Sequence, residues 1–339
     1  MTNYEKGEAR AWAREHLTGV SGVTIPSFTA DLAGLNTKGI AHDIEHLIGL
    51  GFDYTLVMSE LAITPEENAE FTAIARETAG DRLGLFFHAA WGTLAENIQA
   101  VKLAEQAGAD AVLLSYPPQF WPTQESQVYD YTRSFCEATD LAVMLFPIPT
   151  WGFERIHPAG MSVELVRRMI DTIPNVAAIK AEQGYPLPVG PIEAYHHFKD
   201  DVVISCPIES HCIPLMDVLD IRFSGTSNTQ WMSDYFPKAF RLAREGRWTE
   251  AMELYWQINP ARGANDSVAS SYLSSTGAIN RTIWKYQDWL AGFNGGPLRA
   301  PAMRIPDRHM RTLRAGLVAA GLPVTDLPDS EFMVGRHPA

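Results

Sequence analysis

Short apolar runs alternate along the chain with longer segments that have the periodicity of helices. Each run is rich in Val, Ile, Leu or Phe. Because apolar and polar residues do not alternate within the runs, they are typical of parallel strands that are covered on both faces. We expect these strands at residues 22–28, 53–59, 82–90, 111–117, 141–149, 176–182, 202–207 and 221–227.

The segments between these runs carry signals for helix ends. Thr64 and Thr93 each stand three residues before a glutamate, as in the capping box that begins many helices. Gly51 and Gly108 follow the last periodic residue of two other segments. The succession of strand and helix units predicts an α/β fold, a (β/α)₈ TIM barrel. The alternative, a doubly wound sheet, is disfavoured because no G-x-G-x-x-G motif follows the first strand.

The alternation stops at about residue 245, and the rest of the chain has helical patterns without further strands. Prolines and glycines predict an irregular loop at 295–306. The chain thus divides into a barrel with a short N-terminal helix, residues 1–245, and a C-terminal helical region, residues 246–339. Within this second region we expect helices in 250–266, 267–293 and 308–321.

Composition and charge exclude several classes of partner. Of the 339 residues, 46% are hydrophobic and 20% are charged, and the formal net charge is -13. Nucleic-acid binding is disfavoured because phosphates require clustered Lys and Arg. The polar N-terminus lacks a secretory signal, and no stretch approaches the roughly 20 apolar residues of a membrane span. We expect a soluble, cytoplasmic protein that binds neither nucleic acid nor membranes.

Lys180 is the strongest candidate for chemistry. Active sites of such barrels lie at the C-terminal ends of the strands, and Lys180 ends the apolar run Val-Ala-Ala-Ile. Burial there would lower the pKa of its amine and make it a nucleophile near neutral pH. The alternative is a structural lysine paired with a carboxylate, for which Glu182 and Glu60 are the obvious partners. No comparable rival nucleophile is evident at the other strand ends, so the functional interpretation is favoured.

Other candidates for chemistry are weaker. His88 and His211 are isolated, the three cysteines have no disulfide or zinc spacing, and no metal-binding motif is present. We therefore predict no metal and no cofactor. Aromatic residues at the strand ends would line a pocket or pack at its rim; they are Trp91, Phe120, Trp121 and Trp151.

At Lys180 the chain resembles the dihydrodipicolinate synthase and N-acetylneuraminate lyase superfamily of class I aldolases and dehydratases. The correspondence runs in order over roughly residues 17–300. VAAIKAEQG is similar to the strand that carries the Schiff-base lysine of the family. Further similar segments are GVTIPSFTADLAGLN, SELAITPEE, LLSYPPQFWPTQE, FSGTSN and WLAGFNGGPLRAPAMRIP.

The resemblance implies a barrel with a helical C-terminal region that assembles into a homo-oligomer, a tetramer or a dimer. It also implies a small-molecule carbonyl substrate, commonly a 2-oxo acid, that forms an imine with the lysine. The protonated imine is an electron sink for the carbanion left when a C–C or C–O bond breaks.

This chain departs from the family pattern at three places. The G-T-T-G-E loop that holds the substrate carboxylate is replaced by Leu56-Val57-Met58-Ser59-Glu60, where only Ser59 keeps a hydroxyl. Phe146, at the end of the fifth strand, stands where the family has a proton-shuttling tyrosine, and Pro118 and Gln119 replace tyrosines of the loop after the fourth strand. Dihydrodipicolinate synthase activity itself is therefore not expected, and the apolar pocket suggests a larger or aromatic substrate.

From the strand ends and the resemblance together, we predict a catalytic set and a substrate-binding set. Glu182 and His88 are further candidates for moving the proton. The catalytic set is Lys180, Tyr116 and Glu60, and the substrate-binding set is Ser59, Met58, Trp91, Phe146, Ser224 and Gly225.

Three functions remain open from the sequence. The first is an imine-forming lyase, an aldolase or hydro-lyase. The second is a non-catalytic, ligand-binding or regulatory relative that kept the barrel and lost the proton relay. The third is a lyase without an imine, in which Glu60 and His88 act as acid and base.

Overall fold

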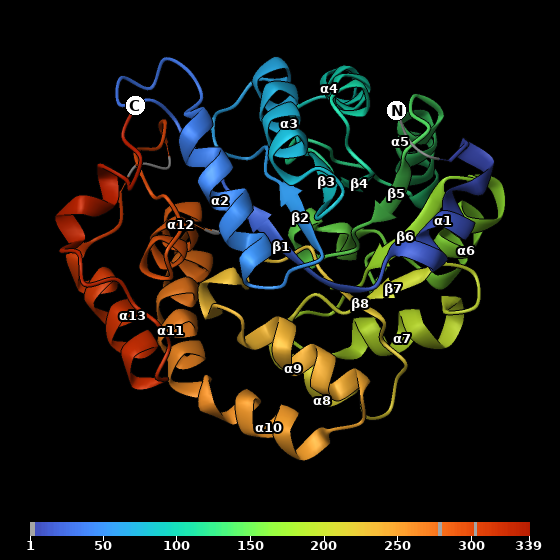
Figure 1. Ribbon diagram of the computed structural model, residues 1–339. Coiled ribbons are helices and arrows are strands. Elements are labelled where there is room, and N and C mark those ends of the chain that lie inside the picture. Colours follow the sequence, from blue (N-terminus) through green and yellow to red (C-terminus); the bar gives the residue numbers. More distant parts are fainter. Residues whose placement is uncertain (1–3, 277–279, 302–303) are drawn as a thin grey trace.

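The computed structural model describes residues 4–276, 280–301 and 304–339, and its centre is a closed barrel of parallel strands in sequence order (Figure 1). Pairing of β1 with β8 closes the barrel. This confirms the predicted fold class. The strands are β1 Gly19–Thr24, β2 Tyr54–Val57, β3 Gly84–Ala89, β4 Ala111–Leu114, β5 Ala142–Leu145, β6 Val176–Lys180, β7 Val203–Ser205 and β8 Phe223–Ser224.

One helix follows each strand and packs on the outside of the barrel (Figure 1). The capping signals form as predicted: the Thr64 hydroxyl accepts from the Glu67 backbone amide at 3.1 Å, and the Thr93 hydroxyl accepts from that of Glu96 at 3.2 Å. The barrel helices are α2 Thr37–Gly49, α3 Pro65–Ala79, α4 Leu94–Gln106, α5 Glu125–Glu137, α6 Val163–Thr172, α7 Val189–Phe198, α8 Glu209–Leu215 and α9 Tyr235–Arg244.

Side chains along the strands alternate between the barrel interior and the layer beneath the helices. In β4, Ala111 and Leu113 belong to the interior cluster, whereas Val112 and Leu114 pack against the surrounding helices. Part of the interior is filled by three aromatic rings whose centres lie 5.5 to 5.8 Å apart, those of Tyr54, Phe86 and Phe223. The barrel is therefore a packed core at this level, not a channel.

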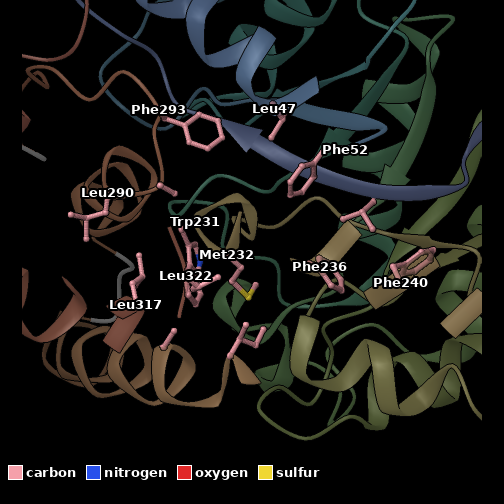
Figure 2. Close-up of a cluster of buried hydrophobic side chains, with 14 of the residues drawn as sticks. Leu47, Phe52, Trp231, Met232, Phe236, Phe240, Leu290, Phe293, Leu317 and Leu322 are labelled. Atoms are coloured by element: carbon pink, nitrogen blue, oxygen red, sulfur yellow. The ribbon is translucent and has the colours of Figure 1, made fainter. Parts of the chain in front are cut away.

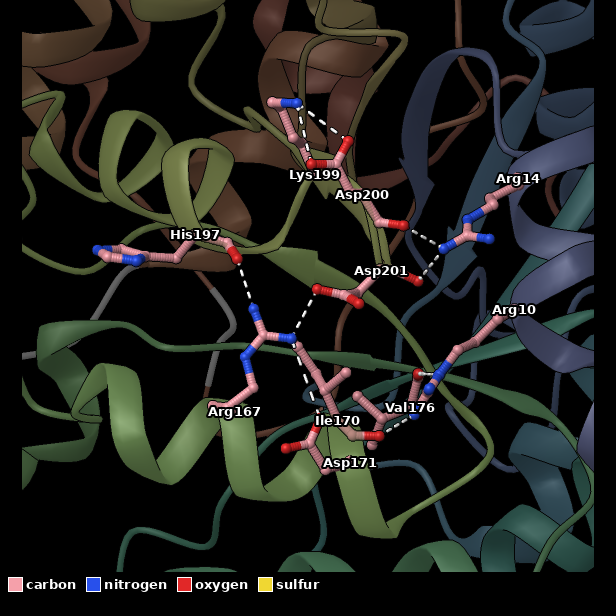
Figure 3. A network of polar contacts seen from close by, with 10 residues as sticks. All are labelled: Arg10, Arg14, Arg167, Ile170, Asp171, Val176, His197, Lys199, Asp200 and Asp201. Atoms are coloured by element: carbon pink, nitrogen blue, oxygen red, sulfur yellow. Dashed lines mark hydrogen bonds and ion pairs between the residues drawn. The ribbon is translucent and has the colours of Figure 1, made fainter.

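The N-terminal end of the barrel is covered by α1, Ala9–His16 (Figure 3). Arg10 of this helix donates to the backbone oxygens of Val176 and Ile173, each at 2.9 Å, and also to that of Ile170. Arg14 donates to the oxygen of Asp201 at 2.8 Å. Because these carbonyl groups lie at the end of α6 and at or just before the beginnings of β6 and β7, α1 leaves the opposite end of the barrel available for a site.

The C-terminal helices pack on one side of the barrel and share its outer core (Figure 2). Trp231 and Phe236, at the end of the barrel segment, belong to the same apolar cluster as Leu290, Phe293 and Leu317. The division at residue 245 stays a prediction. These helices are α10 Trp248–Gln257, α11 Asn259–Thr276, α12 Arg281–Leu290 and α13 Asp307–Ala319.

One helix expected in this region is in fact two. The single helix predicted within 250–266 ends at Gln257 and a second begins at Asn259. Pro260 is the reason, because proline lacks the amide that an interior helical position donates and is tolerated in a first turn. The segment predicted within 267–293 likewise ends and begins again, at Thr276 and Arg281. Among the described residues, no helix has both the length and the apolar character needed to cross a membrane.

Candidate active site

Lys180 and Glu182 point to the same side of the chain at the end of β6. Strand pairing continues past Lys180, because the Ala181 amide donates to the Ser205 oxygen and the Glu182 amide to the Pro147 oxygen, both at 3.1 Å. In extended backbone, residues two apart face the same way. Ala181 belongs to the outer cluster. Lys180 and Glu182 therefore face the interior, at the C-terminal mouth of the barrel.

The Lys180 amine is buried, and its side chain is only 7% exposed. Its Nζ donates to the backbone oxygen of Thr226 at 2.8 Å and lies 3.3 Å from Glu182 Oε1. Burial lowers the pKa of Lys180, while the Glu182 carboxylate acts in the opposite direction. The result is an amine that loses its proton more readily than a surface lysine does, which is the property a nucleophilic lysine needs.

Two predicted substrate-binding residues contribute an apolar wall to this interior. Phe146 and Met58 belong to the buried interior cluster. The Lys180 nitrogen lies 4.1 Å from the centre of the Phe146 ring. Trp151 packs edge-on against that ring and donates from Nε1 to the Phe146 oxygen at 2.6 Å. Phe146 is thereby fixed beside the amine.

A second group of charges lies across the mouth, after β2. Glu60 accepts from Arg281 Nη2 at 2.9 and 2.7 Å, and Glu60 Oε2 lies 4.0 Å from His88 Nδ1. Burial alone would raise the pKa of Glu60, but the Arg281 guanidinium, together with His88 and Lys180, outweighs this effect and lowers the pKa to about 2. Glu60 is therefore ionised at neutral pH and has no proton to donate.

His88 completes this group as a neutral side chain. Burial lowers the pKa of His88 to about 4, although Glu60 favours the protonated ring. Its Nε2 is 2.9 Å from the Ser115 hydroxyl, which also faces the interior. A neutral imidazole beside an ionised carboxylate is able to accept a proton or pass one on, but while neutral it adds no positive charge to the mouth.

Several buried polar atoms at this mouth have no hydrogen-bond partner among the residues that the structure describes. Buried polar groups in folded proteins are nearly always paired, so a cluster of unpaired ones indicates a place for a polar ligand. They belong to residues that follow β2 or β8, lie near the end of β3, or begin α12. The atoms are Ser59 Oγ, His88 Nδ1, Thr226 Oγ1, the side-chain amide of Asn228 and Arg281 Nη1.

The structure does not bring Tyr116, predicted as catalytic, to Lys180. Ser115 faces the interior, so the next residue faces outward. The Tyr116 hydroxyl lies 2.5 Å from Thr132 Oγ1 on α5, within the outer apolar cluster. Burial also raises the pKa of this hydroxyl. Trp91 is likewise directed outward, because its ring stacks on Phe87 of the same outer cluster.

Ser224 and Gly225, predicted to bind substrate, are engaged in closing the barrel. The Ser224 hydroxyl donates to the Cys206 oxygen at 2.7 Å, and the Gly225 amide donates to the Ser205 hydroxyl at 2.9 Å. A Cβ at position 225 would lie 2.4 Å from the Ser21 Cβ, so glycine permits the close approach of β8 to β1.

The sequence did not single out two cations on α12, the partly buried Arg281 and the buried Lys285. Arg281 reaches the mouth, and Lys285 donates to the Pro26 oxygen at 2.7 Å, just beyond β1. Burial lowers the pKa of Lys285 to about 8, while Asp43 and Asp288 oppose the shift. The available signal was the spacing: Arg281, Lys285 and Asp288 recur at i, i+4 and i+7, the positions that a helix normally buries.

Comparison with known proteins agrees with this geometry. The profile of the dihydrodipicolinate synthetase family matches residues 17–262, and the chain belongs to this family. A DapA-like lyase of Pyrobaculum arsenaticum, itself uncharacterised, is 21% identical over 328 residues, which are 90% of this chain and 99% of the relative. A 4-hydroxy-tetrahydrodipicolinate synthase of Lachnoclostridium phytofermentans is 24% identical over 310 residues, 89% of this chain and 98% of the relative.

Solved structures show the same fold. The structure of YagE, a dihydrodipicolinic acid synthase family protein of E. coli K12 in complex with pyruvate, matches with a TM-score of 0.75 at 19% identity, over 90% of this chain and 99% of that one. The resemblance predicted from the sequence is confirmed. At the level of the family, the chain is a lyase.

Proposed function

We propose that this protein is an imine-forming lyase, an aldolase or hydro-lyase, which acts on a 2-oxo acid or related carbonyl compound through Lys180. The observation that carries the proposal is the buried Lys180 amine, with its lowered pKa, at the C-terminal mouth of the barrel. On this proposal it is a homo-oligomer, as the family resemblance implies, and it is cytoplasmic, as the composition of the sequence predicts.

The reaction begins when the neutral Lys180 amine attacks the substrate carbonyl carbon. The resulting carbinolamine loses its hydroxyl as water and becomes an imine, which is protonated on nitrogen. In a hydro-lyase, the carbon next to the imine first loses a proton to give an enamine, which then expels the hydroxyl of the following carbon as water. In an aldolase, the C–C bond beyond the carbon next to the imine breaks instead: its electron pair moves toward the imine nitrogen to give an enamine, and the hydroxyl on the departing carbon loses its proton to become a carbonyl. Protonation of the enamine carbon and hydrolysis of the imine return the free amine.

Glu182 is the residue that moves the proton in this proposal. Its carboxylate is 3.3 Å from the amine and buried, while Phe146, at the place of the family tyrosine, has no exchangeable proton. Glu182 accepts the proton released as the amine attacks and returns it to the hydroxyl that leaves as water. Tyr116 is directed to α5, and Glu60 is held by Arg281.

The test is reductive trapping followed by peptide mapping. The protein is incubated with pyruvate and, separately, with phenylpyruvate in the presence of cyanoborohydride. We expect the mass of the reduced adduct on the peptide that contains Lys180. Lys285, the other buried lysine, is the internal control and should remain unmodified. The absence of any Lys180 adduct with a broad panel of carbonyl compounds, or full activity in Lys180→Ala, would overturn the proposal.

The same panel tests the expected size of the substrate. Phe146 and Met58 make the interior beside Lys180 apolar. An apolar wall favours a larger or aromatic side chain on the carbonyl compound. Preference for pyruvate or small sugar acids over phenylpyruvate would contradict this part of the proposal.

A second candidate function is a ligand-binding relative without turnover. The observation in its favour is Phe146, which puts a ring where the family has its proton carrier. Calorimetry would then show saturable binding of a carbonyl compound that the protein returns unchanged. Product formation that depends on Lys180 excludes this alternative.

A further inference from the structure

The guanidinium of Arg281 is held by two neighbouring side chains, and one of its nitrogens has no partner among the described residues. Its Nη2 donates to both oxygens of Glu60, at 2.9 and 2.7 Å, and its guanidinium lies 4.1 Å from the centre of the Trp284 ring, one turn along α12. Nη1 is buried and has no acceptor among the residues that the structure describes. The guanidinium is thus held rigidly while one amino group remains free to donate.

An unpaired buried N–H on a charged group is costly, so its partner is to be sought outside the described protein atoms. A guanidinium has donors only and pairs best with carboxylates and phosphates. Ser59, which directly precedes Glu60, is a buried residue whose hydroxyl is also unpaired among the described residues. Both atoms therefore favour an anionic oxygen as the ligand.

The balance of charges at the barrel mouth indicates what Glu60 does there. Lys180 is paired with Glu182, Arg281 with Glu60, and His88 is neutral, so the ionised side chains named here balance. Attraction of an anion then depends on the directed donor Nη1 and not on excess positive charge. Glu60 holds Arg281 in the orientation that presents this donor, and it is a positioning residue, not the acid.

We propose that Arg281 is the substrate-binding residue for the carboxylate of the 2-oxo acid, with Nη1 as the donor and Ser59 beside it. This proposal rests on the proposed function and adds to it. Carboxylate recognition then passes from the loop after β2, which has lost its glycines and threonines, to a side chain supplied by α12. Neutral ketones and esters lack the anion that Nη1 binds, and they gain nothing from this contact.

The first experiment compares pyruvate with methyl pyruvate, in which the carboxylate is blocked, in the trapping assay at Lys180. In Arg281→Gln we expect trapping of pyruvate to fall about ten- to a hundredfold, as for the loss of a charge-assisted hydrogen bond. Trapping of the ester should be unchanged. Arg281→Lys should recover only part of the loss, because lysine keeps the positive charge but lacks the planar guanidinium with its fixed set of donors.

The control is Arg299→Gln, which removes another two-point arginine–glutamate pair, with Glu67 at 2.7 and 2.8 Å. It should affect neither compound. An equal loss of acid and ester trapping in Arg281→Gln would indicate a structural role and overturn the proposal. So would unchanged trapping of pyruvate.

A second measurement separates failure of this proposal from failure of the imine chemistry. Pyruvate binding is measured by calorimetry in Lys180→Ala, where no imine can form, and in the same variant with Arg281→Gln. At least tenfold weaker binding in the double variant supports the role of Arg281, even if the parent protein gives no Lys180 adduct. Absence of binding in Lys180→Ala, or equal binding by both variants, overturns it.

Discussion

The amine of Lys180 lies over the ring of Phe146, 4.1 Å from the ring centre. The face of an aromatic ring carries partial negative charge and stabilises a cation, but it cannot transfer a proton. Phe146 therefore affects how readily the amine is protonated, and Glu182, 3.3 Å from Nζ, is the group that we propose moves the proton.

Replacement of Phe146 by leucine should lower the pKa of Lys180 further. The aliphatic side chain keeps the site dry but removes the ring face that stabilises the ammonium form. The measurement is the rate of reductive methylation of Lys180 as a function of pH, followed by peptide mapping. We expect the profile to move to lower pH than in the parent. A profile that stays in place would show that the ring does not influence the amine.

Replacement of Glu182 by glutamine should slow imine formation by about 10²- to 10⁴-fold, the usual contribution of a positioned acid or base. The variant keeps the size of the side chain but cannot accept a proton. Rapid-quench trapping at Lys180 measures the rate. Glu182→Asp, which retains a carboxylate, should lose less, and an unchanged rate in Glu182→Gln would assign proton transfer to another group.

Removal of the Arg10 side chain should destabilise the closed end of the barrel. Arg10→Ala leaves three backbone oxygens, those of Ile170, Ile173 and Val176, without this donor. We expect a loss of about 2–4 kcal/mol in the free energy of unfolding, measured in urea. Arg133→Ala, which removes an exposed pair with Glu137, is the control and should cost about 0.5 kcal/mol or less. Equal losses of unfolding free energy in the two variants would mean that the contacts of α1 do not stabilise this end of the barrel.

The contribution of Asp43 to stability should fall as the pH rises from about 4 to about 7. Burial raises the pKa of this carboxyl to about 7, although the Asn294 amide and Lys285 oppose the shift. In this pH range the folded state retains a proton that the unfolded state has released, so rising pH favours unfolding. A single group of this kind contributes at most about 1.4 kcal/mol per pH unit.

As the pH rises, Asp43→Asn should therefore gain stability relative to the parent when urea midpoints are compared at pH 5, 6 and 7. Some slope should remain, because burial also raises the pKa of Asp288, which faces the same Lys285. An identical slope in parent and variant would show that Asp43 is ionised throughout this range.

The barrel was predictable because its signals are local. Apolar runs, capping residues such as Thr64 and the spacing of the units each depend on neighbouring residues. The position of Lys180 was predictable for the same reason, because an amine at the end of an apolar barrel strand lies at the C-terminal mouth of the barrel. Strand ends were less well placed, and β1 begins at Gly19, three residues before its predicted start.

The direction of side chains at the mouth was not predictable from the same pattern. A strand that is apolar on both faces does not reveal which residues face inward, so Tyr116 and Ser115 could not be told apart. Arg281 was missed for a different reason. It lies 101 positions after Lys180 in the chain, and only the folded C-terminal region brings it to Glu60.

Helix α12 carries Arg281 in its first turn and Lys285 one turn later. Lys285 donates a hydrogen bond to the backbone oxygen of Pro26, just beyond β1. If Arg281 binds the substrate carboxylate as proposed, substrate selectivity can be altered from outside the barrel. Substitutions at the contacts of α12 that shift this helix would move Nη1 relative to the Lys180 amine while leaving every strand-end residue intact. Directed evolution of new substrates in this scaffold would then find productive changes in residues far from the catalytic lysine in sequence.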